Sequence, residues 1–372
     1  MGGYQMDLER TNDLRFESTN APDGLYVVSK SSEYEPHAEF LLPSIYPEKT
    51  TIKDAFEVDC KEFNETFTKG DIISVSNNRK KILGVLSNNA KQNTLLVTER
   101  CDNLCSFCSQ PPNNNPDTHL YINAAYSIIN FNTESVIGIT GGEPLLDKEK
   151  FLTFLDILNK AGNTTPLHIL TNGRSFSDLD FCNEVVEKAS NRDILWGIPL
   201  HGHNHELHDK CVSMPGAFVE TMQGLMNLSY AGQKIELRTV VTKDNYKNLK
   251  NISELANSSF PYIFTHAIMN LEPKGWAKRN FNELYISVVK QMPYISDCVK
   301  NNNLKSLKSM LFNYPLCQTP FDLRDHYYKS ISDWKNYYPA FCNKCKVKND
   351  CGGFFASSVG DYLNVIKLEV EV

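Results

Sequence analysis

The stretch TLLVTERCDNLCSFCSQ, residues 94–110, joins a short apolar run to three cysteines that stand within eight positions of one another. The run is the first of six short segments rich in β-branched and other apolar residues, which are separated by longer amphipathic stretches. Runs of this length and composition predict buried β-strands. The expected strands are residues 94–99, 135–140, 166–172, 194–200, 234–242 and 262–270.

The segments between these runs have the pattern of helices. Residues 147–162 place Phe151 and Leu158 near helical spacing, and residues 216–232 close on Gly232, which suits a helix C-terminal cap. Six strand–helix repeats in series indicate parallel strands joined by crossover helices, and hence an α/β fold. The pattern by itself fits either a doubly wound sheet or a complete or partial barrel.

The chain on either side of the repeats has a different character. Residues 1–90 lack the alternation and contain the short apolar runs DIISVS and KILGVL between turn-like stretches, which predicts a small β-rich or mixed N-terminal accessory module. The repeats define a core over residues 91–290. Residues 291–372 are aromatic-rich and carry clustered cysteines, which predicts a separate C-terminal domain.

Composition excludes several classes of protein. The 372 residues have a formal net charge of −6 and contain no Lys/Arg-rich run, which argues against general nucleic-acid binding. No apolar run approaches the length of a membrane span, and the N-terminus lacks the apolar region of a signal peptide. We therefore expect no membrane association and a cytoplasmic location.

The chain contains eleven cysteines, an odd number that suits metal ligation better than a disulfide framework in a chain without an export signal. Seven of them fall into two groups, one near residue 105 and one near residue 345. The other four are isolated, and we expect them to be buried thiols or incidental surface residues. These four are Cys60, Cys182, Cys211 and Cys298.

The first group is Cys101, Cys105 and Cys108, with the spacing CxxxCxxC. Three thiolates can hold three irons of a four-iron cluster and leave the fourth iron open to a chelating substrate. Because the loop follows a strand, it should lie at the carboxyl edge of the sheet, where α/β folds keep their active sites. A structural zinc site with a distant fourth ligand is the alternative.

The second expected strand runs into Gly141, Gly142, Glu143 and Pro144. CxxxCxxC on one strand and GGEP on the next resemble the radical S-adenosylmethionine (SAM) superfamily. The resemblance implies a partial (β/α)6 TIM-type barrel whose [4Fe–4S] cluster binds SAM and supplies a 5′-deoxyadenosyl radical. In that site the glycines would let main chain approach SAM, and Glu143 would accept a charge-assisted hydrogen bond from the methionine ammonium.

Other residues near this site have two interpretations. The resemblance implies that Phe107 lies against the adenine of SAM, whereas a core aromatic that anchors the loop is the alternative. Thr171 and Asn172, in the TNG that follows the third strand, resemble a further SAM-binding element and also suit an ordinary turn. Arg238 is a candidate partner for the SAM carboxylate or for a structural ion pair. The histidine-rich loop 201–209 is expected to face substrate rather than a second metal.

The second cysteine group is Cys342, Cys345 and Cys351, with Cys317 upstream. Four thiols suffice for one fully ligated [4Fe–4S] cluster or one zinc ion. The spacing CxxCx5C resembles the auxiliary-cluster segments called SPASM and twitch. This chain has Phe355 where the SPASM pattern continues with a cysteine, so the resemblance implies a single auxiliary cluster.

A narrower resemblance rests on SISDWKNYYPAFCNKCKVKNDCGGFFAS, residues 330–357, together with CSFCSQPP and ITGGEPLL. These are similar to the HxsC-type maturases of the His-Xaa-Ser peptide system. The resemblance implies a ribosomally made precursor peptide as substrate, a second radical SAM maturase as partner, and a reductant such as flavodoxin or ferredoxin. The alternatives are a radical SAM enzyme that acts on a nucleoside or RNA, and a non-enzymatic zinc-binding interaction protein.

Overall fold

The computed structural model describes residues 13–15, 18–19, 23–30, 38–41, 58–59, 66–131, 133–260, 262–331 and 335–358. The chain divides into two compact units. The first unit comprises Met1–Glu99, Asn114–Ile169 and Glu187–Ile194, and the second comprises Arg100–Asn113, Leu170–Val186 and Leu195–Val372.

An eight-stranded sheet forms the core, and its strands follow one another in chain order from β8 to β15. Each defined register between neighbours in this sheet, such as β8 with β9 and β12 with β13, is parallel. Sequential order without reversal is the order of a barrel, whereas a doubly wound sheet reverses at a switch point. The strands are β8 (Asn93–Leu96), β9 (Ile137–Thr140), β10 (Leu167–Leu170), β11 (Ile194–Pro199), β12 (Lys234–Val241), β13 (Ile263–Asn270), β14 (Lys308–Phe312) and β15 (Tyr327–Tyr328).

All six strands expected from the sequence are present, and the α/β class with a partial barrel is confirmed. The sheet extends by two strands, β14 and β15, that the sequence did not predict. Strand β14 follows the helix at Val288–Leu304 and pairs with β13, and the two-residue β15 follows two 3₁₀ helices and pairs with β14. These pairings are tertiary features that local sequence does not encode.

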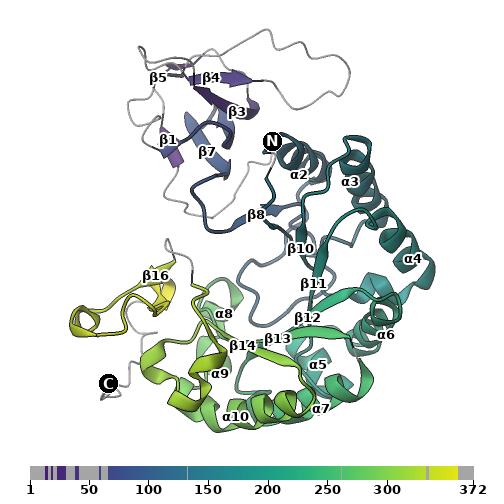
Figure 1. The fold of residues 1–372 in the computed structure, drawn as a ribbon, viewed down its shortest axis with the longest axis vertical. Coiled ribbons are helices and arrows are strands. Elements are labelled where there is room, and N and C mark those ends of the chain that lie inside the picture. Colours follow the sequence, from purple (N-terminus) through teal and green to yellow (C-terminus); the bar gives the residue numbers. More distant parts are fainter. Residues whose placement is uncertain are drawn as a thin grey trace. The chain divides into compact units, whose positions relative to one another are not determined.

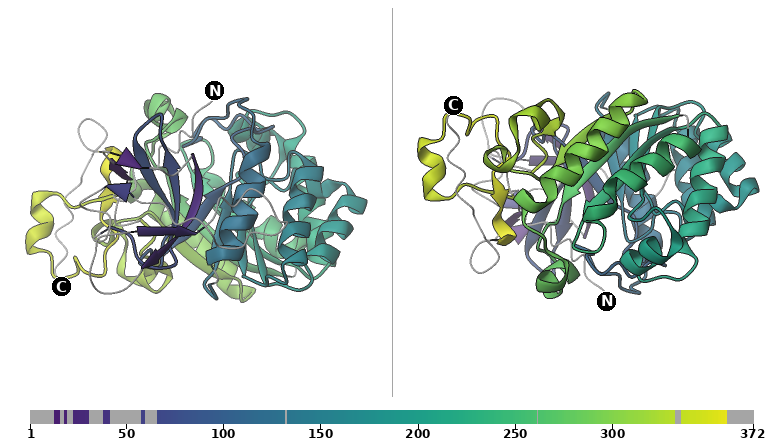
Figure 2. Two further views of the ribbon diagram at one scale, coloured as in Figure 1. Left: turned by 90° about the horizontal axis from the view of Figure 1, so that it is seen from above. Right: turned by 90° about the horizontal axis from the view of Figure 1, so that it is seen from below.

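Helices alternate with the strands. In the second unit, α6, α7 and α10 lie on the outer face of strands β11–β14 (Figure 1), and α7 and α10 pack side by side (Figure 2). The helices are α2 (Thr118–Phe131), α3 (Lys148–Lys160), α4 (Leu179–Lys188), α5 (His205–Val212), α6 (Ala217–Tyr230), α7 (Leu249–Ser259), α8 (Trp276–Arg279), α9 (Phe281–Leu284) and α10 (Val288–Leu304).

The two helices singled out in the sequence are confirmed, together with their ends. Helix α3 begins after Asp147, whose carboxylate accepts a hydrogen bond from the main-chain N–H of Lys150. Helix α6 ends before Gly232, which has a φ of +67° as a helix C-terminal cap requires. Aromatic packing closes the core behind the sheet, where the Phe176 ring meets buried Trp196 edge-on at 4.9 Å.

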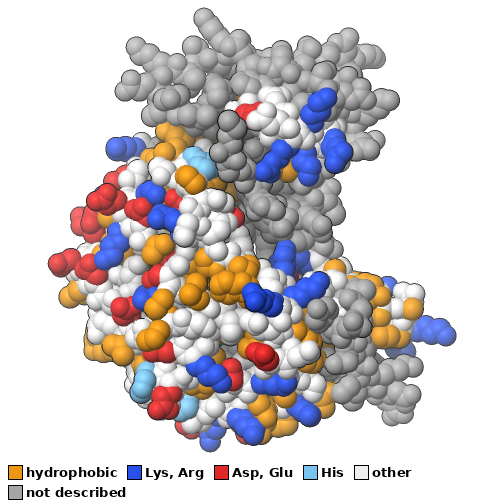
Figure 3. Space-filling model, turned by 180° about the vertical axis from the view of Figure 1, so that it is seen from behind, with side chains coloured by type: hydrophobic (Ala, Val, Ile, Leu, Met, Phe, Trp, Pro, Cys, Tyr) orange, Lys and Arg blue, Asp and Glu red, His pale blue; other side chains and the backbone are white. Residues whose placement is uncertain are grey.

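The N-terminal part contains the expected β structure. A five-stranded sheet has the order β1-β7-β6-β3-β4, with antiparallel pairing throughout its defined registers. DIISVS and KILGVL form the β6–β7 hairpin. Basic side chains gather on the face of this part shown in Figure 3. The strands are β1 (Asp13–Arg15), β3 (Gly24–Lys30), β4 (Ala38–Leu41), β6 (Ile72–Ser76) and β7 (Lys81–Leu86), and β2 (Ser18–Thr19) pairs separately with β5 (Val58–Asp59).

Short 3₁₀ helices and two-residue strands make up the last described part of the chain. They are η3 (Leu316–Gln318), η4 (Phe321–His326), β16 (Asn336–Tyr337), η5 (Ala340–Lys344), β17 (Phe354–Phe355) and η6 (Ala356–Ser358). Two further 3₁₀ helices, η1 (Arg174–Ser177) and η2 (Tyr246–Asn248), lie in the core. Across the described ranges, no helix combines the length and the apolar character that crossing a bilayer requires.

Candidate active site

The cysteine loop follows strand β8 in the chain, and the end of helix α5 holds it in place. The main-chain N–H of Leu104 donates to the carbonyl of Val212 at 2.9 Å, and that of Ser106 donates to the carbonyl of Cys211 at 3.3 Å. Carbonyls in the last turn of a helix have no acceptor role inside that helix. The free end of α5 thus supplies the hydrogen-bond acceptors that fix the loop.

Gly275 holds the other side of the same loop. The N–H of Trp276 donates to the carbonyl of Cys108 at 2.8 Å. Gly275 has a φ of +57°, and a Cβ atom there would lie 2.6 Å from the carbonyl oxygens of both Cys108 and Ser109. Only glycine permits so close an approach. The sequence analysis missed this residue because it lies more than 160 positions from the cysteines that it supports.

The three thiols lie in surroundings that disfavour uncompensated negative charge. A turn closed by the N–H of Cys108 and the carbonyl of Cys105, 3.0 Å apart, sets the second and third cysteines one turn apart. Burial raises the pKa of the Cys105 thiol, and the charges of Cys108 and Cys101 raise it further. Burial also raises the pKa of Cys108. Positive metal ions would compensate this charge, and thiol donors are the ligands that iron–sulfur clusters take.

Phe107 packs into the core. Its side chain is 9% exposed and belongs to a cluster with Cys211, Leu271 and Phe281. The ring also meets His201 edge-on, with centroids 4.8 Å apart. These contacts support the interpretation of Phe107 as an aromatic anchor for the loop, while its contact with adenine stays a prediction.

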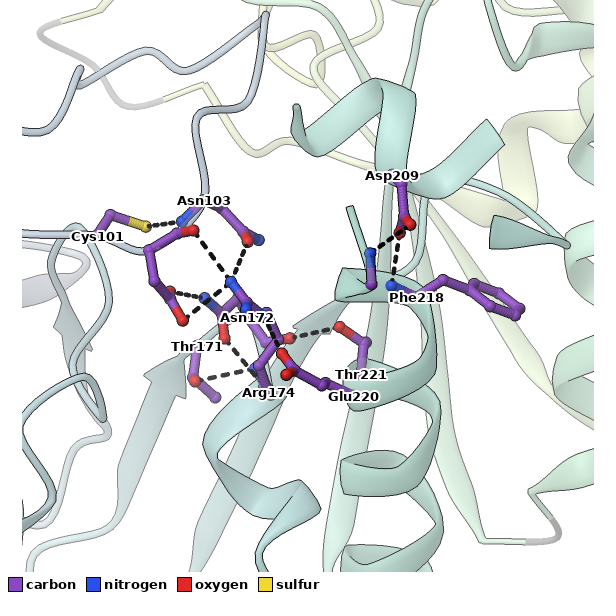
Figure 4. Close-up of polar contacts among 12 residues, drawn as sticks. Cys101, Asn103, Thr171, Asn172, Arg174, Asp209, Phe218, Glu220 and Thr221 are labelled. Atoms are coloured by element: carbon purple, nitrogen blue, oxygen red, sulfur yellow. Dashed lines mark hydrogen bonds and ion pairs between the residues drawn. The ribbon is translucent and has the colours of Figure 1, made fainter. Parts of the chain in front are cut away.

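Asn172 and Arg174, which follow strand β10, contact the residues between the first two cysteines (Figure 4). The Asn172 amide donates to Asp102 Oδ1 at 2.6 Å, and Arg174 Nη1 donates to Asn103 Oδ1 at 2.9 Å. Thr171 Oγ1 accepts the N–H of the following glycine at 3.1 Å, as in an ordinary turn. The part that Thr171 and Asn172 play in binding SAM stays a prediction.

The GGEP residues lie in the first unit and are anchored at both ends. Gly142 donates its N–H to the carbonyl of Thr98 at 2.8 Å, and the carbonyl of Pro144 accepts from the Tyr121 hydroxyl at 2.9 Å. A Cβ atom on Gly141 would lie 2.8 Å from the Thr98 carbonyl oxygen. Glycine is therefore required there by the approach of strand β8, whatever the ligand.

The Glu143 carboxylate is completely buried, and its Oε1 accepts the N–H of Leu145 at 2.9 Å. This hydrogen bond fixes the side chain within the GGEP turn. A buried carboxylate is stable only with hydrogen-bond or charge partners, which suits a residue that receives a ligand ammonium. That role for Glu143 stays a prediction.

A buried polar cluster that the sequence analysis missed supports the same turn. Thr98 donates through its hydroxyl to Asp117, which is 3% exposed. The carboxylate of Asp117 also pairs with Lys150 at 3.1 Å, and Lys150 pairs with Asp147 at 3.0 Å. These contacts hold Thr98, the residue whose carbonyl binds Gly142. The sequence feature that could have indicated Asp117 is its position directly before helix α2.

Arg238 forms an ion pair with Glu236, two positions earlier on strand β12, and its Nη2 lies 3.2 Å from the Met269 sulfur. Glu236 is buried, so an opposite charge is needed beside it. The structural ion pair, one of the two interpretations given above, is therefore present. A contact between Arg238 and SAM stays a prediction.

In the histidine-rich loop, His201 and His208 serve as hydrogen-bond acceptors for main chain. The N–H of His201 donates to Nδ1 of His208 at 3.2 Å, and that of Val240 donates to Nδ1 of His201 at 3.4 Å. Burial lowers the pKa of His208 to about 4 and that of His201 well below its usual value, so both rings are neutral. Both rings therefore hold main chain in place within the second unit.

The second cysteine group draws its thiols from two separated segments. The N–H of Cys345 donates to the carbonyl of Cys342 at 3.1 Å, and the Cys351 sulfur accepts the N–H groups of Leu316 at 3.4 Å and Gly353 at 3.3 Å. Leu316 directly precedes Cys317 in the chain. The hydrogen bond between Leu316 and Cys351 therefore joins the segment of the upstream cysteine to the CxxCx5C segment.

The four thiols of this group interact electrostatically. Burial raises the pKa of Cys317 to about 12, and the charges of Cys351, Cys342 and Cys345 raise it in the same direction. As in the first group, metal ions would relieve this uncompensated charge. Among the residues that the structure describes, no three or more His, Cys, Asp or Glu side chains are arranged about a single metal ion.

Three of the four isolated cysteines, Cys182, Cys211 and Cys298, are buried, as expected for thiols that pack as small apolar groups. The fourth, Cys60, lies outside the described residues.

The sequential parallel sheet, followed after its first strand by a loop with three thiols, defines the class of α/β barrel proteins. Residues 95–256 match the family model of the Radical SAM superfamily. The match covers the core of the chain and supports the expected resemblance to that superfamily, whose members are enzymes that use a [4Fe–4S] cluster and SAM.

Individual relatives are more distant. An AdoMet-dependent heme synthase of Oleidesulfovibrio alaskensis is 27% identical over 168 residues, which cover 44% of this chain and 41% of that protein. A probable GTP 3′,8-cyclase of Pyrobaculum aerophilum is 23% identical over 262 residues, which cover 67% of this chain and 77% of that protein.

Among solved structures, Streptococcus suis SuiB bound to its precursor peptide SuiA aligns with a TM-score of 0.45 and 14% identity, over 62% of this chain and 50% of SuiB. The chain therefore spans half or less of the length of SuiB and of the heme synthase.

Proposed function

We propose that this chain is a radical SAM maturase of the HxsC type, which modifies a ribosomally made peptide of the His-Xaa-Ser kind in the cytoplasm. The observation that carries the proposal is the presence of two thiol groups in one chain. A three-thiol loop follows the first barrel strand, and four thiols from two later segments interact electrostatically. This combination resembles peptide maturases with a twitch or SPASM segment, and the likeness of residues 330–357 supports the narrower assignment.

The first thiol group would hold a [4Fe–4S] cluster on Cys101, Cys105 and Cys108. When bound, this cluster and SAM supply a 5′-deoxyadenosyl radical that takes a hydrogen atom from the peptide. The protein's own part is to hold and orient. The end of α5 and Gly275 fix the cysteine loop. The buried Glu143 carboxylate would accept the methionine ammonium of SAM.

The second thiol group would hold an auxiliary [4Fe–4S] cluster on Cys317, Cys342, Cys345 and Cys351. Four protein ligands leave no iron open to substrate. A cluster held by these four cysteines would supply electron transfer rather than a binding site for substrate. A reductant such as flavodoxin or ferredoxin would serve the first cluster, and a second radical SAM maturase would act on the same peptide.

The test is anaerobic reconstitution with iron, sulfide, dithionite and SAM, with a synthetic peptide from a neighbouring gene that carries His-Xaa-Ser repeats. Mass spectrometry should detect 5′-deoxyadenosine and a changed peptide mass. The control peptide has alanine in place of each repeat histidine and serine and should stay unmodified. Deoxyadenosine without any change in the mass of the repeat peptide would contradict the proposed substrate.

A nucleoside substrate is the second candidate, because the relative that covers 67% of the chain carries the name probable GTP 3′,8-cyclase. The same assay with GTP in place of peptide separates the two. Deoxyadenosine formation that depends on GTP, together with loss of GTP, would replace the peptide proposal. A non-enzymatic zinc protein would instead be colourless, whereas iron–sulfur protein absorbs broadly near about 400 nm.

A further inference from the structure

We propose that Asn172 and Arg174 are positioning residues that hold the cluster loop through Asp102, rather than ligands of SAM. The inference rests on the proposed function, because it concerns the [4Fe–4S] site on the first cysteine loop. It gives the TNG element a role that its resemblance to SAM-binding sequences did not suggest.

The hydrogen-bonding groups of Asn172 have partners within the chain. Its Nδ2 donates to Asp102 Oδ1 at 2.6 Å, and its Oδ1 accepts the N–H of Arg174 at 2.9 Å. The side chain is buried, with 7% exposure. Its main-chain carbonyl accepts from the Thr221 hydroxyl at 3.2 Å, which ties this turn to helix α6. An amide with these contacts is oriented by the protein before any ligand arrives.

The Arg174 guanidinium forms hydrogen bonds and an ion pair with the same loop. Nη1 lies 3.0 Å from the Asp102 carbonyl oxygen, 3.0 Å from Asp102 Oδ2 and 2.9 Å from Asn103 Oδ1. Nε pairs with Glu220 of α6 at 2.6 Å. The planar fork of arginine can join the main chain directly after Cys101 to a helix in this way, whereas the single ammonium of lysine lacks that geometry.

The proposed function of the loop explains why it must be held in a fixed position. Three thiols on a short loop set where the open iron stands, and reactive geometry tolerates displacements of only about 0.5 Å. The loop itself has no regular secondary structure between Cys101 and Cys105. Asp102 and Asn103 are therefore the points through which the surrounding protein fixes the first ligand.

A double-mutant cycle between Asn172 and Asp102 tests the inference. Asn172→Ala, Asp102→Ala and the double variant are reconstituted anaerobically, and the dissociation constant for SAM is measured with the electron paramagnetic resonance (EPR) spectrum of the reduced cluster. If Asn172 acts through Asp102, each single substitution weakens SAM binding about tenfold. The two single variants then show the same change in the EPR spectrum, and the double variant binds SAM as well as either single variant does. Additive losses, about a hundredfold together, would overturn the inference.

Arg174→Lys adds a second measurement that a general loss of stability would not reproduce. We expect it to alter the EPR spectrum as Arg174→Gln does, because the fork is lost while the charge is kept. Full rescue by lysine would contradict the positioning role. Arg192→Gln is the matched control, since Arg192 bonds to Asn159 and Asn163 and should leave the EPR spectrum unchanged.

The wild-type protein distinguishes failure of the inference from failure of the proposed function. Wild type that contains no iron and inorganic sulfide after reconstitution would remove the cluster site itself. Wild type that loads the cluster and binds SAM, with additive losses in the cycle, would remove only the positioning role.

Discussion

The two cysteine groups share one local structure, a CxxC turn, and differ in the residues that surround it. In each, a CxxC turn is closed by the N–H of the second cysteine and the carbonyl of the first, at 3.0 Å in Cys105–Cys108 and 3.1 Å in Cys342–Cys345. The first group completes its set with Cys101 from the same loop. The second needs Cys317, which comes from a segment 25 positions upstream of Cys342. The first group thus depends on proximity in sequence, whereas the second depends on how separate segments fold together.

The two cysteine groups also differ in the contacts that hold them. The first loop is gripped by Arg174, by the end of α5 and by Gly275, which are contacts to its main chain and neighbouring side chains. Main-chain N–H groups reach a sulfur in both groups: Cys101 accepts that of Asn103 at 3.4 Å, and Cys351 accepts those of Leu316 and Gly353. The first loop has the contacts of Arg174, α5 and Gly275 in addition, and such rigid placement suits a site that must orient a substrate.

Among the substitutions that distinguish the two cysteine groups, Cys105→Ala should have the largest effect. Loss of one of three thiols should remove about four irons per chain and abolish 5′-deoxyadenosine formation. Iron, sulfide and deoxyadenosine are measured on the same anaerobic preparation. Cys182→Ala, which removes a buried thiol outside both groups, is the control and should keep the full iron content.

Cys345→Ala should have a different outcome from Cys105→Ala. We expect a loss of about four irons, no modified peptide, and SAM cleavage that continues, because the open cluster on the first loop stays intact. Iron analysis and mass spectrometry of peptide and nucleoside check this. Unchanged iron content would remove the auxiliary cluster from the account.

Gly275→Ala tests the steric support of the first loop. The added Cβ would lie 2.6 Å from two carbonyl oxygens, so we expect the free energy of unfolding to fall by about 3 kcal/mol and iron to be lost from the first group. Gly216→Ala is a matched control with φ of +84° and no atom within 4 Å of the added Cβ. It should cost about 1 kcal/mol and leave the iron content unchanged. Equal effects from both would contradict the steric argument.

Tyr327→Phe probes the sulfur contacts of the second group. The phenol oxygen accepts the N–H of Gly352, the residue directly after Cys351. Burial raises the pKa of Tyr327, and the charge of Cys351 helps to raise it, so the phenol keeps its proton. Polar groups near a cluster favour its reduced state, so loss of this hydroxyl should give a more negative midpoint potential for a cluster on these thiols in an EPR-monitored titration. An unchanged potential would show that the hydroxyl does not tune the site.

The smallest expected effect concerns pH and the support of the first loop. His208 has its pKa lowered to about 4 by burial, whereas an unfolded histidine titrates near about 6.5. As pH falls below 6.5 the unfolded chain takes up this proton and the folded chain does not, so stability falls by about 1 kcal/mol at pH 5.5. Denaturation at pH 7.5 and 5.5 should show a smaller difference in His208→Gln than in wild type. An equal difference would mean that another group carries the effect.

Local patterns predicted much of this molecule. Six strand positions, the cap residue Asp147 and the closing Gly232 follow from hydrophobic periodicity and turn chemistry, which act between near neighbours. The cysteine spacing and GGEP, which are also local patterns, indicated the superfamily whose family model matches residues 95–256. Asp117, Arg174 and Gly275 escaped prediction, because each matters through a contact with a residue that stands far away in the chain.

The sequence by itself therefore determined the parallel α/β class, the three-thiol loop and the residues available for a second thiol group. Only the tertiary structure decided that the strands run in sequential barrel order and that β14 and β15 extend the sheet. It also decided that Cys317 joins the later thiols and that Asp102 is gripped by Asn172 and Arg174. The physical reason is that periodicity and spacing are properties of a segment, whereas charge compensation, steric limits and strand pairing depend on which segments meet.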